Sequence, residues 1–312
     1  MIYKVLVSIC FFLTISCSVV HTKDAEFCSS VRFADTGWTD IAATTAMTSI
    51  VLDEILGYKT NIKLLAVPIT FKSLKNKEID VFMGYWYPSD EMAIAPYLKE
   101  GSIKVVSENL QGAKYMLAVN DAGFALGIKR YQDIAKYRKE LGAKIYAIEP
   151  GNSGNKRILD MIENNELSLK DFHLIESSEQ ASFAQVRRDQ KKNIPAVFLS
   201  WEPHPINLDL NIHYLLGGEN ISGFGKASVY TVVRSDYLDK CPNIARLLKN
   251  IKFSVPLENE MMKLILNNKQ DPKSVGIKMI RDNPDLIKNW LVGVTRFDGQ
   301  NPLDALERLM NK

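Results

Sequence analysis

Short apolar runs alternate with amphipathic stretches through the first part of the chain. The pattern predicts strands at 31–34, 61–67 and 80–84, and helices at 41–56 and 69–77. We expect the first helix to be capped by Thr39 or Asp40 and to end at Gly57. A strand–helix–strand order of this kind is typical of a parallel sheet wound with helices.

The same pattern restarts after an apolar strand at 115–119. It predicts further strands at 144–148, 172–175, 196–200 and 227–233, helices at 132–141, 156–163 and 179–190, a turn at 151–154, and a mostly helical tail from 244 onward. The sequence contains no internal repeat and no long linker. It therefore predicts an α/β protein of two lobes, each a mixed sheet wrapped by helices, with a cleft between them. Ligands of such sheets bind at the carboxyl ends of the strands.

The N-terminus predicts export. Lys4 precedes an apolar run at 5–15 that is too short to cross a bilayer, and a polar stretch follows at 21–24. This arrangement indicates a signal peptide at 1–22, with a buried N-terminal strand as the alternative. Residues 14–17 also resemble a lipobox, which would leave Cys17 as a lipidated N-terminus. The expected location is the periplasm, with the protein free or tethered by its end.

Charge and cysteine content narrow the function classes. The 312 residues carry a net charge of +3, and the basic residues are scattered, which argues against nucleic acid as a partner. Cys10 and Cys17 lie in or beside the signal peptide, so Cys28 and Cys241 remain in the mature chain. In an oxidising compartment, two cysteines favour a disulfide over a metal site. We expect no cofactor and no metal.

Three of the four tryptophans share one topological position. Trp38, Trp86 and Trp201 are each placed just past the end of a predicted strand, whereas Trp290 falls in a helical stretch and is expected in the core. A single tryptophan in a loop more often packs the lobes together. Three at equivalent positions, contributed by both lobes, favour a binding site.

Aromatic rings arranged as a box attract a desolvated cation, because their faces carry partial negative charge. A trimethylammonium head has no N–H to donate, so rings supply both its contact area and its electrostatics. At about 0.5–2 kcal/mol per desolvated ring, three or four rings and methyl burial make micromolar affinity reasonable. The pattern therefore predicts a site for a quaternary ammonium compound.

Two polar candidates accompany the box. Asp40 is either the helix N-cap or an acceptor for a ligand hydroxyl, and its two oxygens can divide these roles. The stretch 149–155 (EPGNSGN) is either a tight turn with an Asx cap or the source of an amide that faces the cleft. Asn152 is the expected amide, with Asn155 as the alternative.

At these residues the chain resembles the periplasmic choline-binding proteins, within the glycine betaine/proline betaine-type substrate-binding family of ABC importers. The resemblance runs from about Cys28 to the C-terminus. The matching stretches are DTGWTD at 35–40, LAVPIT at 65–70, GYWYP at 84–88, EPGNSGN at 149–155, ESSEQA at 176–181, WEPHP at 201–205 and CPN at 241–243.

The resemblance implies a type II periplasmic-binding fold. It implies that lobe one comprises 28–117 and 225–312, and that lobe two comprises 118–224. The site residues implied are Trp38, Trp86, Trp201 and Tyr115 as the box, Asp40 for the choline hydroxyl, and Asn152 in support. A Cys28–Cys241 disulfide is also implied. The lipobox-like stretch at 14–17 departs from the family pattern.

The expected function is therefore capture of choline, with acetylcholine as a tolerated ligand, by a monomer that delivers it to an ABC permease. Glycine betaine or proline betaine is the alternative in the same class. A betaine carboxylate would be repelled by Asp40, and His204 is the residue most able to bind it. A module that feeds a sensor is a further alternative. An enzyme is not expected, because the sequence has no G-x-S-x-G, H-E-x-x-H or P-loop motif.

Overall fold

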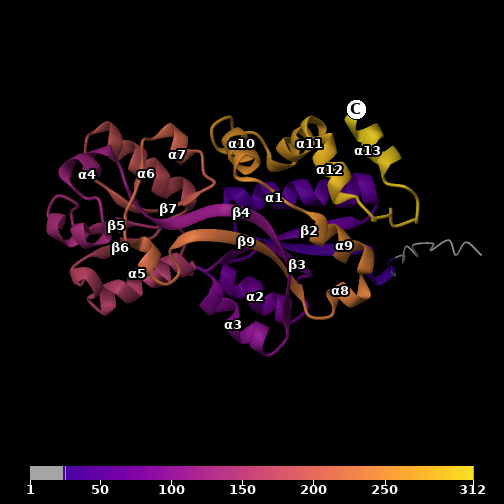
Figure 1. The fold of residues 1–312 in the computed structure, drawn as a ribbon, viewed down its shortest axis with the longest axis horizontal. Coiled ribbons are helices and arrows are strands. Elements are labelled where there is room, and N and C mark those ends of the chain that lie inside the picture. Colours follow the sequence, from indigo (N-terminus) through magenta and orange to yellow (C-terminus); the bar gives the residue numbers. More distant parts are fainter. Residues whose placement is uncertain (1–23, 25, 312) are drawn as a thin grey trace, which may run out of the picture.

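A single mixed sheet runs through the whole molecule, with helices on both faces (Figure 1). The computed structural model describes residues 24 and 26–311, so the predicted signal peptide and Cys17 lie outside the described residues. The order of the strands along the sheet is β2-β1-β3-β9-β4-β7-β5-β6, and β8 pairs with β4. The predicted α/β class is confirmed, and the sheets of the two lobes join edge to edge.

The N-terminal and C-terminal segments build one end of the molecule. Its strands are β1 (Ser30–Asp35), β2 (Lys59–Leu64) and β3 (Val81–Tyr87). The helices of the first segment are α1 (Thr39–Ile50), which continues as a π-helix at Val51–Leu56, α2 (Val67–Lys75) and α3 (Glu91–Lys99). The C-terminal helices are α8 (Tyr237–Lys240), α9 (Pro242–Asn250), α10 (Val255–Leu266), α11 (Pro272–Asp282), α12 (Pro284–Trp290) and α13 (Leu303–Met310). Proline in the first turn starts α2, α9, α10, α11 and α12, where its missing N–H costs no hydrogen bond.

The middle of the chain builds the other end. Its strands are β5 (Lys144–Tyr146), β6 (His173–Ile175), β7 (Val197–Glu202) and β8 (His213–Tyr214). Its helices are α4 (Asp121–Leu126), α5 (Ser153–Glu163), α6 (Glu179–Lys191) and α7 (Ile206–Asp209). The side chain of Asn152 caps α5 and that of Ser178 caps α6, which satisfies N–H groups that a helix start leaves open.

Two long antiparallel strands, β4 (Ile103–Val119) and β9 (Gly225–Arg234), connect the two ends (Figure 1). We keep the names lobe one for 28–117 with 225–312 and lobe two for 118–224. The lobe boundaries stay predictions; they fall inside β4 and at the start of β9.

Several local predictions were wrong. The predicted helix at 132–141 is a 3₁₀ helix at Tyr131–Tyr137. Trp86 and Trp201 lie inside β3 and β7 rather than past their ends. Helix α1 begins at Thr39, its N-cap residue is Trp38, and no side chain of α1 caps it, so neither Thr39 nor Asp40 is the cap. In the described residues no helix is long and apolar enough to span a membrane.

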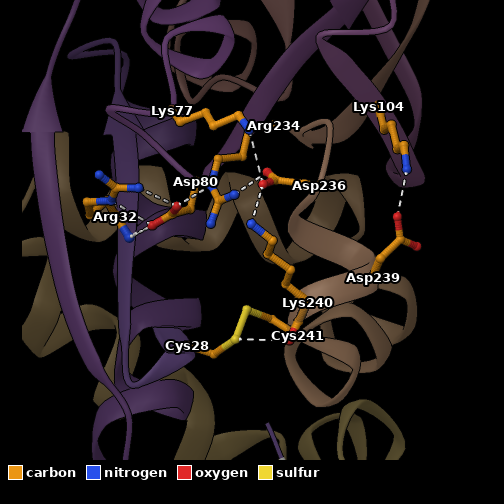
Figure 2. A network of polar contacts seen from close by, with 10 residues as sticks. All are labelled: Cys28, Arg32, Lys77, Asp80, Lys104, Arg234, Asp236, Asp239, Lys240 and Cys241. Atoms are coloured by element: carbon orange, nitrogen blue, oxygen red, sulfur yellow. Dashed lines mark hydrogen bonds and ion pairs between the residues drawn. A yellow bond between two sulfur atoms is a disulfide. The ribbon is translucent and has the colours of Figure 1, made fainter. Parts of the chain in front are cut away.

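A disulfide and a network of buried charges hold lobe one together (Figure 2). Cys28 and Cys241 are bonded across 213 positions of sequence, and both are fully buried. Beside them, the Asp80 carboxylate lies between two guanidinium groups: Nη2 of Arg32 and Nε of Arg234 each lie 2.7 Å from its Oδ1. Burial alone would raise the pKa of Asp80, but the hydrogen bonds from Arg32 and Arg234 outweigh it and lower that pKa.

Candidate functional site

A small pocket lies between the two lobes, at the ends of the strands that carry the tryptophans. Its cavity volume is about 10 Å³, roughly the space that one water molecule needs, so the lining side chains nearly fill it. The residues that line it are Trp38, Asp40, Trp86, Ser89, Tyr115, Ile148, Asn152 and Trp201. All six residues predicted for ligand binding thus meet in one place.

Four aromatic rings line the pocket. Trp38 precedes α1, Trp86 is near the end of β3, Tyr115 is on β4 and Trp201 is on β7, and each is at most 7% exposed. The rings of Trp86 and Tyr115 lie 5.9 Å apart between centroids and are tilted by 45°. Tyr115 pairs with Trp201 across the β4–β7 ladder. The wall can therefore surround a small group with ring faces.

Asp40 contributes a carboxyl group with one oxygen left open. The residue is 1% exposed, and its Oδ1 atom has no hydrogen-bond partner. Burial, followed by the charge of Glu179, raises the pKa of Asp40 to about 8. A buried acceptor without a partner costs free energy. Asp40 is therefore suited to accept a hydrogen bond from a ligand or to pair with a ligand cation.

Asn152 serves as helix cap and as pocket wall at once. Its Oδ1 accepts N–H groups from Gly154 and Asn155 at the start of α5, and it also accepts the Tyr115 hydroxyl at 2.6 Å. A Cβ on Gly154 would lie 2.3 Å from that hydroxyl, so the close approach of Tyr115 requires glycine. Asn155 is buried in hydrogen bonds to Ile148 and Glu149 backbone and to Glu176, and it does not line the pocket.

Two glutamates of lobe two contact the start of α1 in lobe one. Oε2 of Glu149 accepts the indole N–H of Trp38 at 3.1 Å, and Oε2 of Glu179 accepts the backbone N–H of Thr39 at 2.8 Å. The cap that α1 lacks is therefore supplied from the other lobe. Burial raises the pKa of Glu149.

His204 does not line the pocket. It is 1% exposed, and its Nε2 lies 2.9 Å from Oε1 of Glu179. Its Nδ1 accepts the N–H of Ile206, so Nε2 carries the proton and donates it to Glu179. His204 is thus occupied and is not available to bind a ligand carboxylate.

In the part of the chain that the structure describes, the pocket is surrounded by acidic groups and not by basic ones. No Lys, Arg or His is among the described residues that line it. Glu258 of α10 is buried as well, and burial followed by the charge of Asp40 raises its pKa well above the usual value. A site with buried carboxyl groups and no basic residue favours a cation over an anion.

Ser89, Ile148, Glu149, Glu179 and Glu258 were not among the predicted site residues. Glu149 and Glu179 belong to the stretches that carry the family resemblance, which was the available signal. Ser89 and Ile148 offer no chemical signature of their own, and Glu258 lies in the tail that the pattern describes only as helical.

A pocket closed between two α/β lobes that share long strands is the architecture of solute-binding proteins of importers. The chain belongs to the family described as the substrate binding domain of ABC-type glycine betaine transport systems, OpuAC, which matches residues 29–280. It is therefore the substrate-binding protein of a glycine betaine/choline ABC transporter and not an enzyme, and its family implies an ABC permease as partner.

Individual relatives agree with this assignment. The glycine betaine/carnitine transport binding protein GbuC of Listeria monocytogenes is 27% identical over 169 residues, which cover 52% of this chain and 55% of that protein. A solved ABC-transporter choline-binding protein in complex with choline is 49% identical, with a TM-score of 0.90 over 92% of this chain and 100% of that chain. Lactococcal OpuAC complexed with glycine betaine shares the fold at 19% identity, with a TM-score of 0.75 over 84% of this chain and 98% of that chain.

Proposed function

We propose that the protein captures choline in the periplasm and delivers it to an ABC permease. The observation that carries the proposal is a pocket walled by Trp38, Trp86, Trp201 and Tyr115, with the open carboxyl oxygen of Asp40 in the same wall. The rings would hold the trimethylammonium head through cation–π attraction and methyl burial. Asp40 would accept the choline hydroxyl, and Asn152 would assist.

The acidic groups of the site support this choice of ligand. A cation brought into the pocket compensates a buried carboxylate that has no basic residue beside it in the wall, so binding stabilises the ionised form of Asp40. The 49% identity to a structure with bound choline supports the same ligand class. Capture would proceed by closure of lobe two onto lobe one, because the ring wall draws on both lobes.

Glycine betaine is the second candidate, and the family description and the Listeria relative favour it. Its carboxylate needs N–H or O–H donors. The pocket offers the indole N–H of Trp86 together with the side chains of Ser89 and Asn152. It offers no basic group, and Asp40 would repel the carboxylate where it is ionised, at about pH 8 and above. This contrast places choline ahead of betaine.

Calorimetric titration of the mature protein, from about residue 23, tests the proposal. Choline should bind with micromolar affinity, acetylcholine more weakly, and glycine betaine much more weakly than choline. If betaine binds more tightly than choline, the transport function stands and the ligand belongs to the betaine class. Failure of both to bind would remove the aromatic box as the site. We expect a monomer throughout.

A further inference from the structure

We infer that Glu149 and Glu179 form a latch between the lobes that holds the closed form shut over its ligand, with His204 as the residue that orients Glu179. The inference rests on the proposed capture of choline and names residues that do not line the pocket. Both glutamates belong to lobe two, and each accepts an N–H group of lobe one.

Every oxygen of the latch is already committed. Glu149 accepts the indole N–H of Trp38 with Oε2 and the backbone N–H of Glu179 with Oε1, at 3.1 and 3.0 Å. Glu179 accepts Thr39 N–H with Oε2 and His204 Nε2–H with Oε1, at 2.8 and 2.9 Å. Each carboxylate thus joins a donor of lobe one to a donor of lobe two.

The latch needs carboxylates rather than neutral amides. A glutamine side chain has one acceptor oxygen and one donor NH₂ group. Its NH₂ group would therefore face one of the two N–H groups that each glutamate now accepts, and two donors cannot bond to each other. In Glu179→Gln the clash reaches further: His204 would have to move its proton to Nδ1, which now accepts the N–H of Ile206.

Helix ends stabilise the two negative charges. Thr39 starts α1, a 12-residue helix without a side-chain cap, and Glu179 starts α6, a 13-residue helix. Each glutamate therefore lies at the positive end of a helix, where an anion is favoured. In the described part of the chain neither Glu149 nor Glu179 forms an ion pair with arginine or lysine, so the latch relies on N–H donors.

The partners of the latch are also the start of the binding site. Trp38 and Asp40 line the pocket on either side of Thr39. Contacts between the lobes can form only when the lobes approach, so their loss should speed the release of ligand more than it slows capture. When the contact with Glu149 is lost, the pocket wall opens at Trp38.

The latch is tested by the kinetics of choline release, measured by stopped-flow tryptophan fluorescence on wild type, Glu149→Gln and Glu179→Gln. Each variant should raise the dissociation rate by about tenfold or more and change the association rate by less than about threefold. Glu166→Gln is the matched control, because Glu166 pairs with Arg157 inside lobe two, and its rates should stay at the wild-type values. The thermal midpoint of the empty variants should stay near that of wild type, since the latch lies between the lobe cores.

Wild-type dissociation rates in both glutamine variants would overturn the latch and leave the proposed function standing. An association rate that falls in both variants, with the dissociation rate at the wild-type value, would overturn it as well. If Glu179→Gln does not fold, Glu149→Gln decides alone. If wild type does not bind choline, the proposed function fails, and small-angle scattering of the empty proteins decides: the latch requires a larger radius of gyration in both variants than in wild type and Glu166→Gln, and equal radii overturn it.

Discussion

Lobe one contains two aspartates that are equally buried and opposite in character. Asp80 and Asp40 are each 1% exposed. Asp80 accepts hydrogen bonds from Arg32 and Arg234, and its pKa is lowered. Asp40 has an open oxygen and no basic partner, and its pKa is raised to about 8.

The difference lies in where the compensating charge comes from. Around Asp80 the protein itself supplies two guanidinium groups, so the carboxylate stays ionised and stabilises the fold (Figure 2). Around Asp40 the protein supplies rings and further carboxyl groups, so a cation must come from outside. In this pair, the buried acid without a cation lies at the binding site, and the buried acid with two cations lies in the scaffold. Changes in the Asp80 region should reduce stability alone, and changes in the Asp40 region should alter binding.

The largest effect is expected from removal of the disulfide beside the Asp80 network. The bond closes a loop of 213 residues, and the chain-entropy account gives it about 5 kcal/mol of unfolding free energy. The double variant Cys28→Ser with Cys241→Ser should lose about that amount in denaturant unfolding. Choline affinity of the protein that remains folded should be unchanged; a parallel loss of affinity would show that the two regions are not separate.

Replacing Asp80 with Asn should cost about 3 kcal/mol of unfolding free energy, because the buried Arg234 loses one of its two carboxylate partners and keeps only Asp236. Wild type should also lose this stabilisation in acid, since the lowered pKa of Asp80 means that its contribution is present at neutral pH and disappears as the pH falls through the folded-state pKa. Asp239→Asn is the control, because the Lys104–Asp239 pair is exposed and contributes about 1 kcal/mol or less. Equal losses in both variants would contradict the prediction.

Loss of a box ring should produce the largest effect on binding. Trp86→Ala and Trp201→Ala each remove a desolvated ring, which amounts to about 2 kcal/mol or more and roughly thirtyfold or more in the Kd for choline. Trp290→Phe, in the core against Phe253, is a tryptophan control that should leave the Kd unchanged. Calorimetric titration gives both values, and undiminished binding in the two alanine variants would exclude the box.

Much of this site could be predicted because topology brings strand ends together. Trp86 and Trp201 lie on β3 and β7, and the pattern alone placed them near strand ends; Tyr115 on β4 came from the family resemblance. Asp40 was harder: an Asp near a helix start has an ordinary function as cap, and only the structure shows that Glu179 caps α1 instead.

The contacts between the lobes were beyond prediction. Glu149 and Glu179 meet Trp38 and Thr39 across 111 and 140 positions of sequence, and no local pattern specifies such a distance. The first part of β4 was missed for another reason. Its pairing with β9 shifts register between Val105 and Ser107 and twice more before Ala113, so polar and apolar residues do not alternate regularly.

Asp40→Asn should weaken choline binding by about 1.5 kcal/mol, roughly tenfold in Kd, since the amide still offers an acceptor but no charge. The same variant should stabilise the empty protein. The raised pKa of Asp40 means that its contribution to stability is present below about pH 4 and is lost as the pH rises toward about 8. Thermal unfolding at pH 8 should therefore show a gain in the variant, and a loss there would contradict the unpaired state of Asp40.

The smallest effect is the pH dependence of choline binding. If choline requires ionised Asp40, affinity should rise about threefold between pH 7.5 and 8.5 and level off above that, with release of a proton on binding. Glu179 and Glu258 are the neighbouring acids. The charge of Glu179 helps to raise the pKa of Asp40, and the charge of Asp40 helps to raise the pKa of Glu258. Titrations in buffers of different ionisation enthalpy measure the proton, and Asp40→Asn should show neither the slope nor the release.

Because lobe two caps α1, two protons of lobe one report on whether the lobes are in contact. The amide proton of Thr39 and the indole proton of Trp38 are held by Glu179 and Glu149, and both lose their acceptors when the lobes part. Their chemical shifts and their exchange with deuterium therefore follow the opening of the cleft directly. Labelling tryptophan with ¹⁵N, without any engineered probe, would therefore measure how often the cleft opens between two ligand-binding events.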